Sequence, residues 1–178
     1  AEEYAMRFGL TETGLRIEFS ECGTERQPMY ASSKTAVLNA LASIPNGVQS
    51  MSAEIKDLVE TSCNMGIIRT DEIGVKLTVS VRSSSGSEKR ALIDRIGLAV
   101  TGSGGSFSVS GEYPAWEYKK HSRLRELAAE AYVKQYGSEP VISAIHAGLE
   151  CGIFCGKLPE LDCISFGPNI YDIHTPKE

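Results

Sequence analysis

The residues best suited to chemistry lie in two loops in the last third of the chain. His146 follows a short apolar run, and an acidic residue, Glu150, comes four positions later. His174 lies in a second loop that is flanked by Pro168 and Pro176. Imidazole is the commonest zinc ligand among side chains that are neutral at pH 7. Both loops are therefore typical of a metal-binding active site, with His174 as the best ligand candidate.

The sequence leaves an alternative open for each loop. His174 is either a zinc ligand or an exposed loop histidine near the last residue of the chain. The segment from His146 to Glu150 contains Gly148, so we expect a loop that turns into the N-terminus of a helix. Free N–H groups at such a turn suit an anion, for example a substrate carboxylate. The alternative is that Glu150 caps the helix beside a core histidine.

Arg82 is a third candidate, because it lies on the polar side of a predicted strand. Apolar residues from Val75 to Val81 alternate with polar ones, which predicts a strand with one buried and one hydrated face. Arg82 belongs to the hydrated face and is followed by three serines. A guanidinium there can hold a carboxylate through two parallel hydrogen bonds. The alternative is a surface ion pair with the neighbouring strand.

Cysteine usage indicates reduced thiols. The five cysteines are odd in number and contain no Cys-x-x-Cys pair, which favours a cytosolic protein over a disulfide framework. Cys151, Cys155 and Cys163 fall close together in the sequence. They are either zinc ligands or ordinary buried thiols, and their spacing fits no common zinc-finger pattern.

The elements that would position these residues begin with a predicted α+β domain. We expect a hairpin in residues 4–21, a helix from Ser32 or Ser33 to Pro45, and strands in 57–68 and 75–83. A second helix is expected from Ser87 to the Gly-rich run 101–105, followed by a strand in 107–110. From residue 15 to 110 the order is strand, helix, two strands, helix, strand. This order is that of a ferredoxin-like α+β sandwich.

Composition shifts at about residue 117, where Trp116 is expected to anchor a hinge. Ser122 then caps a predicted helix that Gly137 closes. Short apolar strands are expected in 141–145 and 162–166, each leading into one of the two loops, with a helical turn in 149–156. This arrangement indicates part of an α/β domain, in which ligand sites gather at the carboxyl ends of strands.

Overall composition narrows the class of protein. The net charge is −5 and no dense Lys/Arg cluster is present, which argues against nucleic-acid binding. No apolar run approaches the roughly 20 residues that a membrane-spanning helix needs. The acidic N-terminus lacks a hydrophobic signal core, so secretion is not indicated. A chain of 178 residues, 42% of them hydrophobic, suits one large domain or two small ones.

Several runs resemble one family, the bacterial aminoacyl-histidine dipeptidases, also called Xaa-His or cytosolic non-specific dipeptidases. Its C-terminal stretch is similar to Ile145-His-Ala-Gly-Leu-Glu-Cys-Gly-Ile-Phe154, Leu161-Asp-Cys-Ile-Ser-Phe-Gly-Pro-Asn-Ile170 and His174-Thr-Pro-Lys-Glu178. Its lid domain is similar to Leu58-Val-Glu-Thr-Ser-Cys-Asn-Met-Gly66, Ser80-Val-Arg-Ser-Ser84 and Ser110-Gly-Glu-Tyr-Pro-Ala-Trp116. The family belongs to the two-zinc peptidase superfamily that includes aminoacylase and carboxypeptidase G.

The resemblance implies a cytoplasmic enzyme that hydrolyses Xaa-His and other dipeptides through a zinc-activated water, and that forms a homodimer through its lid. Residues 1–117 would be the lid and dimerisation domain, and 118–178 the C-terminal part of the zinc-peptidase catalytic domain. His174 would be the last zinc ligand. Arg82 would reach the C-terminal carboxylate of the substrate, with Gly148 and Glu150 lining the same site.

The sequence departs from the family because the His-x-Asp zinc motif, the bridging Asp and the paired Glu residues are not present. We therefore expect a piece of a longer enzyme that is inactive alone, contains no catalytic residue and does not hold the two zinc ions. The alternative is a non-catalytic, self-associating domain that binds no metal. A third possibility is tripeptides or acylated amino acids as substrates, but relatives with those substrates carry a Gly-Gly-Thr-like loop at this place.

Overall fold

The computed structural model describes residues 6–7, 14, 16–21, 23, 28–144 and 150–171. The chain divides into two compact units, Ala1–Lys34 and Thr35–Glu178. The helices and strands that follow residue 30 are α2 (Ala31–Ser43), β1 (Gly47–Met51), β2 (Val59–Thr70), β3 (Val75–Ser83), α3 (Gly86–Gly102), α4 (Arg123–Tyr136) and α5 (Glu150–Lys157). Among the described helices, none combines the length and apolar character that crossing a membrane requires.

The three strands form one antiparallel sheet in the order β1-β2-β3. β3 has the bounds that the sequence predicts, and its exposure alternates along its whole length. β2 is close to its predicted range, and a shift in its pairing with β3 lies between Met65 and Ile67. β1 was not expected from the sequence. It pairs along β2, with Gly47 opposite Cys63.

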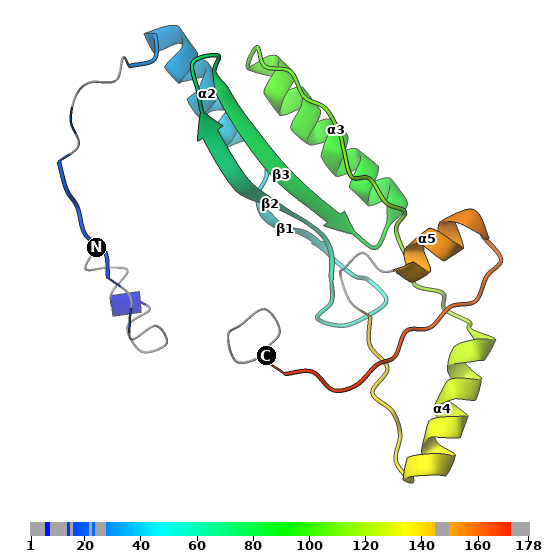
Figure 1. Cartoon of the computed structure of the whole chain (residues 1–178). Coiled ribbons are helices and arrows are strands. Elements are labelled where there is room, and N and C mark those ends of the chain that lie inside the picture. The colour runs from blue at the N-terminus through cyan, green and yellow to red at the C-terminus, as the bar shows by residue number, and fades with distance from the viewer. Residues whose placement is uncertain are drawn as a thin grey trace. The chain divides into compact units, whose positions relative to one another are not determined.

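One face of the sheet is covered by α3, which runs alongside β3 in Figure 1. Among the described residues, the buried apolar side chains at this interface are Ile44, Cys63, Leu92 and Ile96. Partly buried apolar residues of β2 and β3 pack around them, as does the last part of α3. Because side chains alternate along a strand, the other face carries the polar residues of β3, including Arg82. The structure is thus α+β, with a packed face and a hydrated face.

Local sequence signals place the ends of two helices. Ser85, rather than the expected Ser87, is the N-cap of α3, and its hydroxyl accepts a hydrogen bond from the Glu88 N–H group at 3.4 Å. Ser122 caps α4 as predicted. Gly137 ends α4 in the left-handed region, with φ of 72° and its N–H group donating to the Val133 carbonyl. Only glycine adopts this conformation without a steric cost, so this helix ends where the sequence indicates.

The strand predicted in 107–110 is wrong. The segment is not a strand; after α3 the chain runs back along this helix (Figure 1). The ring of Phe107 fills the space beside Gly97, where a side-chain carbon would collide with it. Contact with α3 thus replaces pairing with the sheet. The four-stranded ferredoxin-like order is not confirmed, because the described residues form a three-stranded sheet.

The other expected strands are also absent from the described residues. Residues 16–21, 141–144 and 162–166 are not in strands, and residues 6–7 of the predicted hairpin are helical. Residue 14 lies in a turn, and the other positions of the hairpin and residue 145 lie outside the described residues. A strand persists through hydrogen bonds to a neighbouring strand, and none of these segments has such a neighbour in the described part of the chain. Val141 is 94% exposed and Phe166 is 91% exposed. The expected helical turn after residue 149 is confirmed as α5.

Candidate functional site

Arg82 lies one residue before the end of β3, on the exposed face. The residue opposite it on β2 is Ser62, which carries no charge. Within the described part of the chain, no carboxylate forms an ion pair with Arg82. The cross-strand ion pair considered for this position is therefore wrong. As far as the described residues go, the planar set of donors on the guanidinium is available for an external carboxylate.

The residues around Arg82 fix the backbone at the end of β3. The hydroxyl oxygens of Thr61 and Ser83 are 2.8 Å apart, and Thr61 is buried. The N–H group of Ser84 donates to the carbonyl of Glu60 on β2 at 3.1 Å. These bonds join the strand end to its neighbour. The side chain of Arg82 is thus exposed on a backbone that is held on one side by β2.

Glu150 is the first residue of α5, and its side chain is exposed. The positive end of the helix dipole favours a carboxylate in the first turn, so this position suits an ionised acid. In the described residues, neither a hydrogen bond nor an ion pair joins Glu150 to Arg82. The structure places the two predicted substrate contacts on separate elements and does not bring them into contact.

His146, Gly148 and His174 lie outside the described residues, and their predicted roles stay predictions. In the parts of the chain that the structure describes, no group of three or more His, Cys, Asp or Glu side chains is arranged to hold a metal ion. The described residues therefore do not form a zinc site by themselves.

Three thiols gather where α5 meets the segment that follows it. The Cys151 thiol donates to the carbonyl of Ile164 and the Cys155 thiol to that of Leu161, both at 3.9 Å. Burial raises the pKa of both thiols, and the neighbouring Cys163 raises each pKa further. These contacts turn the Cys151 and Cys155 thiols toward backbone carbonyls, as is usual for ordinary cysteines in a protein interior. The zinc-ligand alternative for the three cysteines stays a prediction.

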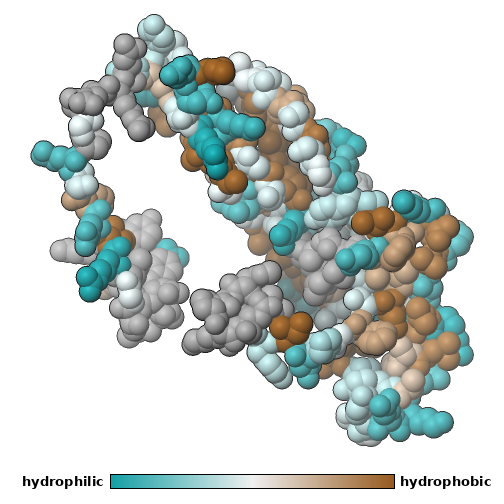
Figure 2. Space-filling view, viewed as in Figure 1, coloured by the Kyte–Doolittle hydropathy of each residue, from teal (hydrophilic) through white to brown (hydrophobic). Residues whose placement is uncertain are grey.

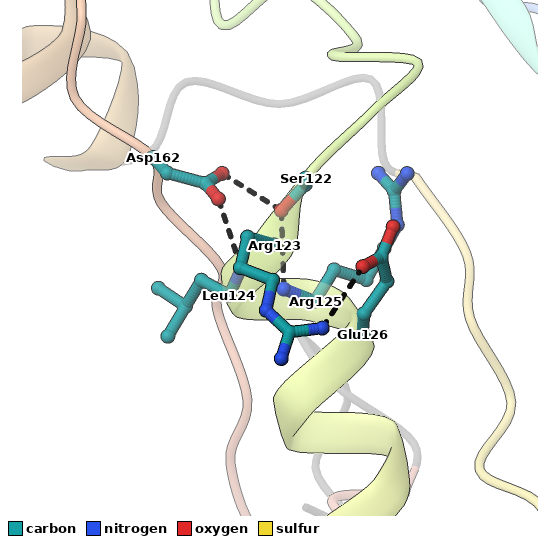
Figure 3. A network of polar contacts seen from close by, with 6 residues as sticks. All are labelled: Ser122, Arg123, Leu124, Arg125, Glu126 and Asp162. Carbon is teal, nitrogen blue, oxygen red and sulfur yellow. Dashed lines mark hydrogen bonds and ion pairs between the residues drawn. The ribbon is translucent and has the colours of Figure 1, made fainter.

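Asp162 ties the N-terminus of α4 to the same segment (Figure 3). One of its oxygens accepts a hydrogen bond from the Ser122 hydroxyl at 2.7 Å, and the other accepts from the Leu124 N–H group at 2.9 Å. The Ser122 oxygen in turn accepts from the Arg125 N–H group at 3.1 Å. Donation from Leu124 and then from Ser122 lowers the pKa of Asp162. Sequence reasoning missed this role, because the partners are about 40 residues apart.

Comparison with known proteins finds relatives in the family that the sequence motifs resemble. The chain is 31% identical over 167 residues to the cytosol non-specific dipeptidase of Escherichia coli, across 94% of this chain and 34% of that protein. It superposes with a TM-score of 0.84 and 34% identity on the crystal structure of aminoacylhistidine dipeptidase from Vibrio alginolyticus, covering 96% of this chain and 35% of that one. No protein-family profile matches the sequence.

A third likeness is to aminopeptidase PepT from Bacillus cereus, with a TM-score of 0.53 and 20% identity over 69% of this chain and 34% of that chain. A sequence identity of 20% supports a shared fold and nothing about the activity of this chain. The resemblance to the aminoacyl-histidine dipeptidases is confirmed by the two dipeptidases, which match nearly the whole chain. The chain spans about a third of the length of either relative.

Proposed function

We propose that this chain, a homologue of the aminoacyl-histidine dipeptidases, is one part of a zinc-dependent enzyme that hydrolyses Xaa-His and other dipeptides. Residues 1–117 form its lid, and residues 118–178 form the C-terminal part of its catalytic domain. The observation that carries this proposal is the structural likeness to the Vibrio enzyme, which extends across nearly the whole chain. A likeness confined to the sheet and α3 would have supported a lid domain alone.

Arg82 binds the C-terminal carboxylate of the dipeptide in this proposal, and Gly148 and Glu150 line the same site. The exposed guanidinium supports this role, because the described residues offer it no acidic partner. A guanidinium and a carboxylate match in shape and charge, so the pair fixes both the orientation of the substrate and the end at which it is cleaved.

Zinc is assigned to the longer protein. His174 contributes one ligand, and the remaining ligands and the general base come from sequence that this chain does not contain. When bound, zinc supplies an activated water for attack on the peptide carbonyl. We expect the chain alone to be inactive, because the family motifs for these groups are not in its sequence.

The surface of α4 and α5 fits a protein that continues beyond this chain. Figure 2 shows apolar side chains gathered over these two helices. Leu127 of α4 and Phe154 of α5 are among the exposed apolar residues. Such a surface is normally covered in a soluble protein. Since the relatives are about three times as long, we infer that the remainder of the catalytic domain packs there.

Dimerisation through the lid and a cytoplasmic location complete the proposal. Within the described residues, β1 and β3 each have one neighbouring strand, so the sheet has two open edges. An open edge can pair with a second copy of the same chain.

A substrate panel tests the proposed activity. A chain extended to the length of its dipeptidase relatives should hydrolyse β-alanyl-histidine faster than tri-alanine or N-acetyl-methionine. A preference for N-acetyl-methionine would overturn the dipeptidase assignment. Hydrolysis of none of the three would favour the non-catalytic, self-associating alternative.

A further inference from the structure

Residues 112–117 cross between the end of the α3 region and the start of α4, and we call them the strap. At its last residue, the strap caps α3: the Glu117 carboxylate accepts a hydrogen bond from the Gly86 N–H group at 3.1 Å. Gly86 is the first residue of α3, where N–H groups have no partner inside the helix. A carboxylate is the favoured partner there, because it also complements the helix dipole.

A second residue of the same helical turn holds the middle of the strap. Lys89 donates a hydrogen bond to the carbonyl of Tyr113, and its ammonium lies 5.3 Å from the centre of the Tyr113 ring. Arg90 and Glu112 form an exposed ion pair at 3.7 Å. Exposed ion pairs of this kind contribute little to the free energy of folding. The Glu117 and Lys89 contacts, which engage backbone groups, therefore define where the strap lies on α3.

The strap also forms a seat for α5. A side-chain carbon added at Gly152 would lie 3.0 Å from the Pro114 carbonyl oxygen and 3.4 Å from Trp116 Cβ. One added at Gly156 would lie 2.7 Å from Pro114 Cγ. Two glycines four residues apart lie on one face of a helix, so α5 approaches the strap along a face without side chains.

The strap thus connects the elements that carry the two proposed substrate contacts. Gly86 comes four residues after Arg82, and the intervening turn is held by the Ser85 N–H group donating to Ser83 Oγ at 3.0 Å. Glu150 is the first residue of α5, and Gly152 follows two positions later. A continuous set of contacts therefore runs from the end of β3 through α3 and the strap to α5.

We propose that the strap fixes the position of Arg82 relative to Glu150, and that Glu117 and Gly156 are positioning residues for dipeptide binding. The assignment of a substrate role to Arg82 and Glu150 rests on the proposed function. The connection of α3 to α5 through the strap is independent of that assignment, because it rests on the contacts of Glu117, Lys89 and Gly156. Neither positioning residue touches substrate in this account.

Amide hydrogen exchange tests the connection without any need for activity. In the extended protein, Glu117→Ala should increase exchange both in residues 86–90 and in α5, because the cap of α3 and the seat of α5 both belong to the strap. Glu117→Gln keeps an acceptor oxygen and should restore most of the protection. Glu130→Ala, on the exposed face of α4, is the matched control. Increased exchange in residues 86–90 with α5 unchanged would overturn the proposal.

Kinetics test the positioning role. Alanine favours a helix over glycine, so Gly156→Ala should harm the enzyme only through its collision with Pro114. We expect KM for a free dipeptide to rise by about tenfold. This is smaller than the loss of about 10²-fold in catalytic rate that a misplacement of about 1 Å can cause. KM for the dipeptide amide should change little. Gly102→Ala is the control, since this helical glycine has open space around its α-carbon.

A double-mutant cycle separates positioning from general destabilisation. If Gly156 acts through Arg82, Gly156→Ala should add little to the KM effect of Arg82→Ala. Fully additive effects, or equal effects on dipeptide and amide, would overturn the positioning role. An extended wild-type protein that cleaves no dipeptide would instead remove the proposed function, and hydrogen exchange would still decide whether the strap connects α3 to α5.

Discussion

Replacing Arg82 by alanine is the substitution that most directly separates substrate binding from fold stability. Arg82 is exposed, faces Ser62 across the sheet and has no acidic partner in the described residues. Surface substitutions of this kind usually change the free energy of unfolding by no more than about 0.5 kcal/mol. The variant should therefore fold normally and unfold at the wild-type temperature.

The kinetic effect should be much larger than the stability effect. A hydrogen bond to a charged group contributes about 1.5–3 kcal/mol, and removing the guanidinium leaves the substrate carboxylate without its partner. Since about 1.4 kcal/mol corresponds to a factor of ten, KM for a free dipeptide should rise by about tenfold to a hundredfold. KM for the dipeptide amide should barely change, because the amide carries no carboxylate. Arg82→Lys should fall between wild type and alanine, since it keeps the charge and loses the planar fork.

The assay is steady-state hydrolysis by the extended protein of alanyl-histidine and of its C-terminal amide. Lys76→Ala is the matched control, because Lys76 lies on the same exposed face of β3. Equal effects of Arg82→Ala on the two substrates would refute the assignment. So would a Lys76→Ala variant that loses as much activity on the free dipeptide.

The remaining predictions concern the described residues themselves. The lowered pKa of Asp162 means that its stabilising contribution is present at neutral pH and is lost as pH falls below the ordinary value of 3.8. Thermal melts at pH 7 and pH 3 should therefore differ less for Asp162→Asn than for wild type, and an unchanged difference would remove Asp162 as the source. The raised pKa values of Cys151 and Cys155 predict slower alkylation by iodoacetamide at pH 8 than for free cysteine, with a rise in rate displaced above pH 9.0. Peptide mass spectrometry measures this, and labelling as fast as free cysteine would contradict it. Gly137→Ala should lower stability by about 1–2 kcal/mol in urea unfolding, because alanine is strained at φ of 72°. A loss of unfolding free energy smaller than the error of the urea measurement would mean that the end of α4 adopts another conformation without strain.

Short-range signals predicted the parts of the fold that depend on neighbouring residues. Ser122 and Gly137 give the ends of α4 correctly, since capping depends on groups within one turn. β3 was predicted because its alternation continues over the whole strand. The hydrated face of that strand also identified Arg82 as exposed.

Features that depend on distant partners were not predicted correctly. The apolar run before His146 resembles a strand, but residues 141–144 have no neighbouring strand in the described part of the chain. Residues 107–110 were assigned to the sheet, whereas Phe107 packs on Gly97 of α3. The cap that Glu117 provides to Gly86 joins residues 31 positions apart. Such contacts leave no periodic trace in a sequence.

We propose that this chain carries part of a dipeptidase site and depends on a longer protein for the rest. Hydrolysis of β-alanyl-histidine with added zinc, by this 178-residue chain and by a chain extended to the length of the dipeptidase relatives, tests it most directly. We expect activity in the extended protein and none in the shorter chain. Activity in the shorter chain, or in neither protein, would mean that the proposed division of the site is wrong.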